Sequence, residues 1–203
     1  MTCGPTWVAI DAVRVISNIS TGELGHIIAS DLAKEGARTT LLEGPVTHHA
    51  LLKKVKVLKF YYFDELFPLL VKELKKGYDI VIHLAAVADY QVKKSFKSKL
   101  DSSLRNLTLN LTPTRKIIEV IKTLSPETFL VGFKLEDRTL ENGLRKKALR
   151  LIEKAGCDLV VANGATRQGY IAYVLDQEGK ILSRDKKKEG LSKHLIQWLK
   201  QRT

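Results

Sequence analysis

The chain has 203 residues, of which 44% are hydrophobic, so it is long enough for one α/β domain with a sizeable core and too short for two domains of ordinary size. It has no uninterrupted apolar run long enough to span a bilayer and no basic-then-apolar N-terminus, so we expect a cytoplasmic protein without a membrane partner. The formal net charge of +12 suits nucleic acid or small polyanionic substrates, but the basic residues are dispersed without interleaved aromatic residues, which disfavours a nucleic-acid partner.

Strand and helix patterns alternate along the chain and predict a single α/β domain over 1–203, with a Rossmann-like, mainly parallel sheet covered by helices on both faces. The predicted elements, in chain order, are a helix over 22–34, strands over 39–42 and 54–60, a helix over 64–76, strands over 79–84 and 107–111, a helix over 116–124, a strand over 129–133, a helix over 140–154 and a strand over 158–162. After Gly169, the pattern predicts a β-hairpin formed by 170–175 and 180–183, and then a closing amphipathic helix over about 191–199.

The segment over about 91–105 is rich in lysine and serine and shows little periodicity. Long irregular segments within compact domains are usually functional or disordered. We interpret this one as a flexible substrate-covering loop, with a solvated insertion as the alternative.

The predicted first helix begins near Gly22, after Ser20 and Thr21. The first amides of a helix lack intrahelical partners and carry the positive end of its dipole, so a start made of small residues can bind phosphate oxygens. An ordinary capped helix uses the same residue types and remains the alternative. Arg14 and Asn18 lie just upstream.

The predicted strand over 79–84 leads into Ala85-Ala86-Val87-Ala88-Asp89-Tyr90. Ligands of open parallel sheets bind beyond the carboxyl ends of the strands, where small side chains let a ligand approach the backbone. Extended short-chain dehydrogenases end a strand in a similar His-Leu-Ala-Ala, so an NAD(P)-dependent reductase is an alternative. It lacks a Gly-x-Gly-x-x-Gly motif, and its Tyr-x-x-x-Lys pair is matched only by Tyr90 and Lys94, outside a helix.

The cysteine and histidine residues predict no metal site. Cys3 and Cys157 are far apart in the sequence and fit free thiols in a reducing compartment. His48 and His49 have no third ligand at a suitable spacing, so we interpret both as surface residues.

Several separated motifs, taken together and in this order, resemble the phosphopantothenate-cysteine ligase family. The opening stretch Thr2-Cys3-Gly4-Pro5-Thr6, Ile10-Asp11, Val13-Arg14 and Ile16-Ser17-Asn18-x-Ser20-x-Gly22-x-x-Gly25 is similar to the family's opening motif. The stretch over 85–90 is similar to its Ala-Ala-Val-Ala-Asp-Tyr signature, and Gly132-Phe133 and the stretch over 158–163 are similar to two later strand ends. The resemblance covers residues 2 to about 163.

The resemblance implies a ligase that joins 4'-phosphopantothenate to L-cysteine through an acyl-nucleotidylate, using CTP or ATP with Mg²⁺. It also implies that the ligase is a homodimer. It implies that Lys99 stabilises charge during attack on the α-phosphate. It implies that Asn18 holds the acyl intermediate and that Arg14 supports the same loop. The nucleotide-binding residues that it implies are Gly4, Ser20, Gly22, Gly25, Ala85, Ala86, Asp89, Phe133, Arg150, Lys154 and Asn163.

The chain departs from the family pattern at several positions. Lys99-Leu100-Asp101-Ser102 has an aspartate where the family keeps a second lysine, and Gly164 replaces a usual aspartate. The family has an apolar strand before the first turn, whereas this chain begins with Met1-Thr2, so we expect either a truncated start or another segment in that central position. The decarboxylase domain often fused upstream is absent, so we expect a stand-alone ligase, with an inactive homologue as a further alternative.

Overall fold

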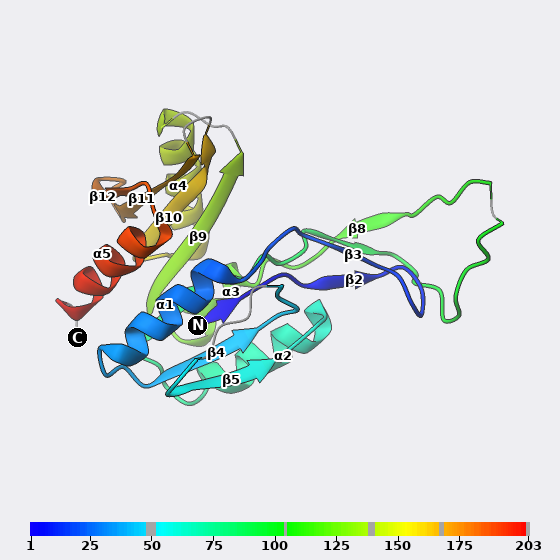
Figure 1. Ribbon diagram of the computed structural model, residues 1–203, viewed down its shortest axis with the longest axis horizontal. Helices are drawn as coiled ribbons and strands as arrows, with labels where there is room; N and C mark the ends of the chain where they lie inside the picture. The colour runs from blue at the N-terminus through cyan, green and yellow to red at the C-terminus, as the bar shows by residue number, and fades with distance from the viewer. Residues whose placement is uncertain (48–51, 104, 138–140, 167–168, 202–203) are drawn as a thin grey trace.

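The computed structural model describes residues 1–47, 52–103, 105–137, 141–166 and 169–201; His48 and His49 lie outside these ranges. The strands of its main sheet are β1 (Thr2–Cys3), β4 (Thr39–Glu43), β5 (Val55–Lys59), β6 (Ile80–His83), β9 (Phe129–Asp137), β10 (Leu159–Thr166), β11 (Gly169–Asp176) and β12 (Ile181–Asp185). Within the described residues the sheet has eight strands in the order β12-β11-β10-β9-β6-β1-β4-β5 (Figure 1). The strands from β10 to β5 are parallel, and β11 and β12 join antiparallel at one edge.

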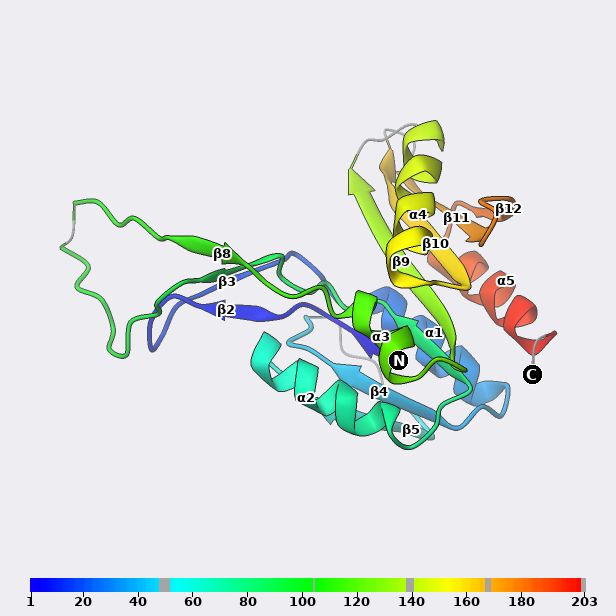
Figure 2. The ribbon, with the colours of Figure 1, turned by 180° about the vertical axis from the view of Figure 1, so that it is seen from behind.

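Helices cover both faces of this sheet, which confirms the predicted fold class. Helices α1 (Glu23–Lys34) and α5 (Lys188–Lys200) lie on one face, and α2 (Phe63–Leu74), α3 (Ile118–Leu124) and α4 (Glu141–Ala155) lie on the other (Figures 1 and 2). Side chains of successive strand residues point to opposite faces, so Val81 packs in the core under α2, α3 and α4, whereas the next residue, Ile82, packs in the core under α1 and α5. Successive apolar residues of β6 therefore pack into two different cores, one on each face of the sheet.

Four short strands form an arm that extends from the body of the protein (Figures 1 and 2). Strand β2 (Trp7–Ala9) pairs antiparallel with β3 (Val15–Ser17), and β7 (Tyr90–Val92) pairs antiparallel with β8 (Leu111–Pro113). We call residues 7–18 and 90–113, where described, the arm. The predicted main-sheet strand over 107–111 is wrong, because this segment lies in the arm and only its last residue enters β8.

The central strand β1 is only two residues long. Thr2 pairs with Leu42 of β4 on one side and with His83 of β6 on the other. The segment that leads into the first turn thus occupies the central position where the family pattern has a longer apolar strand. Beyond β1, Gly4 adopts φ +78 and its carbonyl accepts a hydrogen bond from Ala86 N–H at 2.8 Å, so the turn stays attached to the segment after β6.

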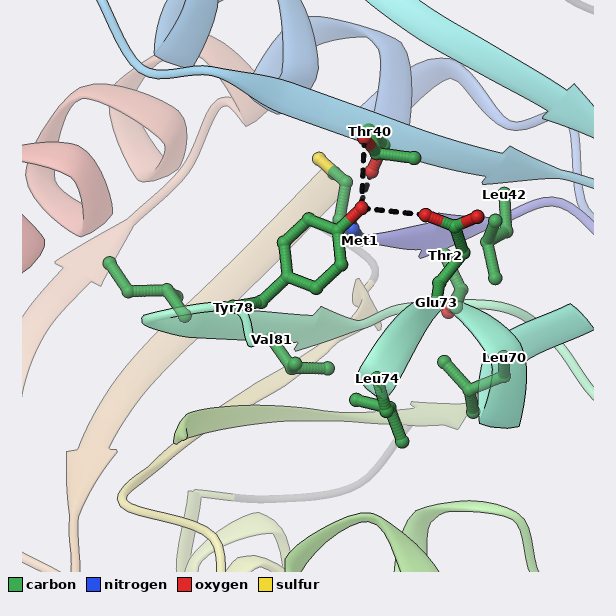
Figure 3. Close-up of a pocket in the computed structure, with 10 residues that line it drawn as sticks. Met1, Thr2, Thr40, Leu42, Leu70, Glu73, Leu74, Tyr78 and Val81 are labelled. Carbon is green, nitrogen blue, oxygen red and sulfur yellow. Dashed lines mark hydrogen bonds between the residues drawn. The ribbon is translucent and has the colours of Figure 1, made fainter. Parts of the chain in front are cut away.

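A small pocket lies at Tyr78, beside Met1, Glu73 and Thr40 (Figure 3). The Tyr78 hydroxyl lies 2.7 Å from the Glu73 carboxylate and 3.1 Å from the Thr40 hydroxyl. The pocket encloses about 20 Å³, which is room for one water molecule. Any substrate larger than a water molecule therefore has to bind elsewhere.

Candidate active site

A cleft of about 1270 Å³ lies where the carboxyl ends of β6, β9 and β10 meet the start of α1. This is the edge at which open parallel sheets bind ligands. Helices α3 and α4 form the opposite wall. Among the residues named from the sequence, those that line the cleft are Asn18, Ser20, Gly22, Ala85, Ala86, Asp89, Phe133, Arg150, Lys154 and Asn163.

The start of α1 forms one wall of the cleft. Gly22 occupies the N-cap with φ +80, and a Cβ built there would lie 2.3 Å from Val46 Cγ1, so only glycine fits. No side chain caps the helix through this residue. Glu23 N–H donates to Thr21 Oγ1 at 3.3 Å, whereas the following amides of the first turn, at Leu24 and Gly25, lack intrahelical partners and can bind an anion beside Ser20.

Gly25 and Gly4 do not line the cleft. A Cβ at Gly25 would lie 2.3 Å from the Cβ of Cys3, so this glycine lets α1 pack closely on β1. A Cβ at Gly4 would lie 2.7 Å from Val46 Cγ1. In the structure, both glycines shape the elements that carry the cleft.

The segment after β6 forms the floor of the cleft and is held from both sides. Thr6 Oγ1 accepts a hydrogen bond from Ala88 N–H at 2.9 Å, and Thr114 Oγ1 donates to Ala88 O at 2.6 Å. Asn18 Nδ2 donates to Ala86 O at 3.0 Å. The small side chains over 85–88 and these anchors leave a fixed backbone surface for a ligand.

Helix α4 contributes a basic wall. Lys147, Arg150 and Lys154 line the cleft at spacings of three and four residues, which places them on one helical face. Burial by itself would raise the pKa of Glu136, but hydrogen bonds from Lys147 and Lys134 outweigh that effect and keep the pKa of this carboxyl below its usual value.

Positive side chains outnumber carboxylates around the cleft, although some of them form ion pairs. The cations that line it are Arg115, Lys116, Lys134, Lys147, Arg150, Lys154 and Lys188, and the carboxylates are Glu23, Asp89, Glu119 and Glu136. Lys116 pairs with Asp89 at the rim, and Lys188 pairs with Glu23. The surplus of positive charge favours a polyanionic ligand.

Apolar and aromatic groups line the side of the cleft nearer to α1. Phe133, on β9, packs against the core under α1 and α5, and Asn163 and Tyr170 lie on the neighbouring strands β10 and β11. Burial raises the pKa of Tyr170 well above its usual value. A flat heteroaromatic ring would find apolar surface and polar neighbours here.

Lys99 and Arg14 lie on the arm and do not line the cleft of their own chain. Arg14 Nη2 donates to Leu100 O at 2.8 Å, and the Asp11 carboxylate accepts hydrogen bonds from Leu100 N–H at 3.0 Å and from Arg14 Nε at 2.9 Å. The hydrogen bond from Leu100, with further ones from Val13 and Arg14, holds the pKa of Asp11 far below its usual value. This clamp fixes the segment next to Lys99.

The carboxylates that line the cleft can supply only some of the oxygen ligands of a magnesium ion. Mg²⁺ prefers oxygen ligands and usually binds through one or two carboxylates together with phosphates of the substrate. Asp89, Glu136 and Glu23 are each paired with a lysine, whereas Glu119 has no ion pair among the described residues. The donor set fits an ion that arrives with a phosphorylated ligand.

A second set of metal-binding residue types lies away from the cleft. Cys3, His26 and Glu43 are buried together beneath α1, within 4.8 Å of one another. His26 and Lys59 both hydrogen-bond the Glu43 carboxylate and, against the opposing effect of burial, lower its pKa. The His26 and Lys59 side chains therefore stabilise the charged form of the buried Glu43 carboxylate.

Residues 1–201 match the family model of the DNA/pantothenate metabolism flavoprotein C-terminal domain. The chain belongs to this family. A curated relative, the coenzyme A biosynthesis bifunctional protein CoaBC of Thermococcus kodakarensis, is 39% identical over 164 residues, which are 80% of this chain and 40% of the relative. The chain therefore spans less than half the length of this member of the DNA/pantothenate metabolism flavoprotein family.

Two solved structures share the fold of the present chain. The DNA/pantothenate metabolism flavoprotein of Streptococcus pneumoniae superposes with a TM-score of 0.88 at 24% identity, over 100% of this chain and 97% of the other. A mutant of Cab2 in complex with phosphopantothenate-cysteine superposes with a TM-score of 0.73 at 18% identity, over 100% and 87%. Nothing in these likenesses supports the reductase alternative or the inactive-homologue alternative.

The sequence interpretation missed several residues of the cleft. Lys147 lies one turn before Arg150, so helical spacing was a signal that could have found it. His83 was assigned only to a buried strand, and Tyr170 only to a hairpin. No helix in the part of the chain that the structure describes has the length and apolar character of a membrane span.

Proposed function

We propose that the chain is a ligase of coenzyme A biosynthesis that joins 4'-phosphopantothenate to L-cysteine, using CTP or ATP. The observation that carries the proposal is the combination of a helix start with a glycine N-cap and a basic α4 wall around one cleft, because both suit a triphosphate. The names of the CoaBC relative and of the Cab2 complex with phosphopantothenate-cysteine support the same reaction.

A carboxylate is a poor electrophile and needs a leaving group before an amine can attack it. In the proposed first step, the phosphopantothenate carboxylate oxygen attacks the α-phosphorus of the nucleotide, and pyrophosphate leaves with the bonding electrons. In the second step the cysteine amine attacks the acyl carbon, the nucleoside monophosphate leaves, and the amine gives up a proton as the amide forms.

We assign roles to the residues of the cleft on this basis. The α1 start and the pair Arg150 and Lys154 hold the phosphates, while the ring of Phe133 contacts the base. Asn18, already hydrogen-bonded to the cleft floor, presents its side-chain oxygen to the acyl intermediate. Bound Mg²⁺ supplies charge neutralisation of the triphosphate, with Glu119 as the available carboxylate.

We further propose that the chain acts as a homodimer through the arm. Large apolar side chains are exposed along it, including Val13 at 64%, Tyr90 at 55% and Phe96 at 41% relative exposure. Exposed apolar groups that gather on one feature mark an interaction surface. A second copy would also bring Lys99, which lies outside the cleft of its own chain, toward the cleft of its partner, where it would stabilise the charge that develops at the α-phosphate.

Pyrophosphate release by the purified protein tests the reaction. We expect release that requires 4'-phosphopantothenate and Mg²⁺ with either CTP or ATP, and amide product only when cysteine is added. Release independent of phosphopantothenate, or none with either nucleotide from folded protein, contradicts the proposal.

Mixing two variants tests the dimer. Lys99→Gln and Arg150→Ala should each be weakly active, and after mixing and exchange about a quarter of the sites should be intact if Lys99 acts in the cleft of the other copy. A mixture that is no more active than its components contradicts action between copies.

A further inference from the structure

His83 is the last residue of β6, and it has no role in the reaction as described above. Its side chain is 7% exposed and lines the cleft. Nδ1 lies 3.0 Å from Thr2 Oγ1, whereas Nε2 has no hydrogen-bond partner among the residues that the structure describes. The ring is thus fixed at one nitrogen and open at the other.

The hydrogen bonds of Thr2 decide which nitrogen carries the proton. Thr2 Oγ1 accepts from Ala85 N–H at 3.1 Å and from Leu84 N–H at 3.2 Å, which it shares with the Thr2 carbonyl oxygen. A hydroxyl has two acceptor lone pairs and one hydrogen, so both lone pairs are used and the hydrogen is directed at His83 Nδ1. Nδ1 is therefore the acceptor, and the proton of the neutral ring sits on Nε2.

Two further observations keep the ring in this state. A second proton on Nδ1 would have to compete with the Leu84 and Ala85 amides for the lone pairs of the Thr2 hydroxyl oxygen. Burial, with a smaller effect from the Met1 amino group, lowers the pKa of His83 to about 4. At neutral pH the ring is an uncharged donor fixed at the cleft.

The position of His83 favours an anionic acceptor. The residue two positions earlier, Val81, packs in the core under α2, α3 and α4, so strand alternation and the Thr2 hydrogen bond place the imidazole on that face of the sheet. Arg150 and Lys154 line the cleft from α4 on the same face. A ligand group drawn to this side by two cations carries negatively charged oxygens.

We propose that His83 is a ligand-binding residue whose Nε2–H donates a hydrogen bond to a phosphate oxygen of the nucleotide in the cleft. This inference rests on the proposed function for the identity of the ligand. A neutral donor orients the phosphate through a directional hydrogen bond and adds no charge to a site that already has a surplus of cations.

Two substitutions separate the two nitrogens of the ring. The amide oxygen of His83→Asn takes the place of Nδ1 and still accepts from Thr2, but it leaves no donor at the position of Nε2. The amide nitrogen of His83→Gln takes the place of Nε2 and keeps a donor toward the cleft, but it loses the acceptor toward Thr2. A purely structural role for His83 predicts that Gln is the worse replacement, whereas ligand binding predicts that Asn is.

Binding is measured by calorimetry with CTP and ATP, and with tripolyphosphate and cytidine as probes for the phosphates and the nucleoside. We expect His83→Asn to bind the nucleotide and tripolyphosphate about tenfold more weakly than the unsubstituted protein, with His83→Gln within about threefold, and cytidine binding unchanged by either. Nitrogen NMR of labelled histidine should show a protonated Nε2 at pH 7 whose resonance moves when nucleotide is added.

An Asn variant that binds as tightly as the unsubstituted protein, an effect on cytidine alone, or an Nε2 resonance that nucleotide does not move overturns the inference. Tight nucleotide binding together with any of these results leaves the ligase proposal intact. Absence of nucleotide binding by the unsubstituted protein overturns both, and pyrophosphate release then reports on the reaction separately.

Discussion

The neutral, buried His83 should make the folded protein sensitive to mild acid. The pKa of its ring is lowered from 6.5 to about 4 in the folded state. As the pH falls below 6.5, the unfolded chain binds a proton at this residue that the folded chain does not bind until about pH 4. The unfolded state is thereby favoured throughout this window, and the free energy of unfolding decreases.

The size of the effect follows from the two pKa values. Each unit of difference is worth about 1.4 kcal/mol, so the full window is worth about 3 kcal/mol, of which about 2 kcal/mol falls between pH 7 and pH 5. His83→Asn cannot titrate and keeps the hydrogen bond with Thr2. We expect the free energy of unfolding of the variant to decrease by about 2 kcal/mol less than that of the unsubstituted protein over this range.

Urea unfolding at pH 7 and pH 5 measures both quantities, and an unchanged slope against urea shows that the unfolded states are comparable. Titrating groups that do not act on His83, including the carboxyls whose pKa values are lowered, are common to both proteins and cancel in the comparison. The Met1 amino group, whose pKa is lowered to about 6, also titrates in this window and has a smaller effect on His83. Equal losses in the two proteins would refute the argument that the folded state excludes a proton from His83.

Three further changes test the packing, the cleft and the arm. Gly25→Ala should lower the free energy of unfolding by about 1–2 kcal/mol, because a Cβ that lies 2.3 Å from Cys3 Cβ outweighs the gain in helix propensity; greater stability in urea would contradict this packing. Arg150→Ala should raise the nucleotide KM about tenfold, whereas Arg145→Ala, on α4 outside the cleft, should change it less than twofold; similar effects would count against a specific phosphate contact. Asp11→Asn should speed tryptic cleavage over 93–103 without shifting the Tm of the body, since it weakens the clamp on Leu100, and an unchanged cleavage rate would show that the clamp contributes little.

The body of the fold could be predicted because its elements bury apolar residues in regular patterns. The stretch over 80–83 is apolar up to its last residue and becomes a strand buried on both faces, and Leu24 and Ile28 mark the buried side of α1. The arm gave no comparable signal. Its strands are three residues long, and Tyr90 and Leu111 remain exposed, so burial imposes no alternation there.

The cleft was predictable where the local sequence determines the geometry. Gly22 sits at a helix start because it alone tolerates the positive φ and the contact with Val46, and a glycine before a helical pattern is visible in the sequence. The state of His83 was not predictable, because it depends on a hydroxyl 81 residues earlier in the chain that is itself held by two amides. Such a property arises only when distant strands become neighbours.

The hydrogen bond from Asn18 to Ala86 O joins the root of the arm to the floor of the cleft. A ligand that fixes the floor therefore also fixes the root of the arm, and a partner that holds the arm restricts the floor. Free energies of coupling are reciprocal, so any factor by which a contact at the arm tightens ligand binding is also the factor by which the ligand tightens that contact. Dimer assembly would then depend on the substrate concentration, and substrate binding would depend on assembly to the same degree.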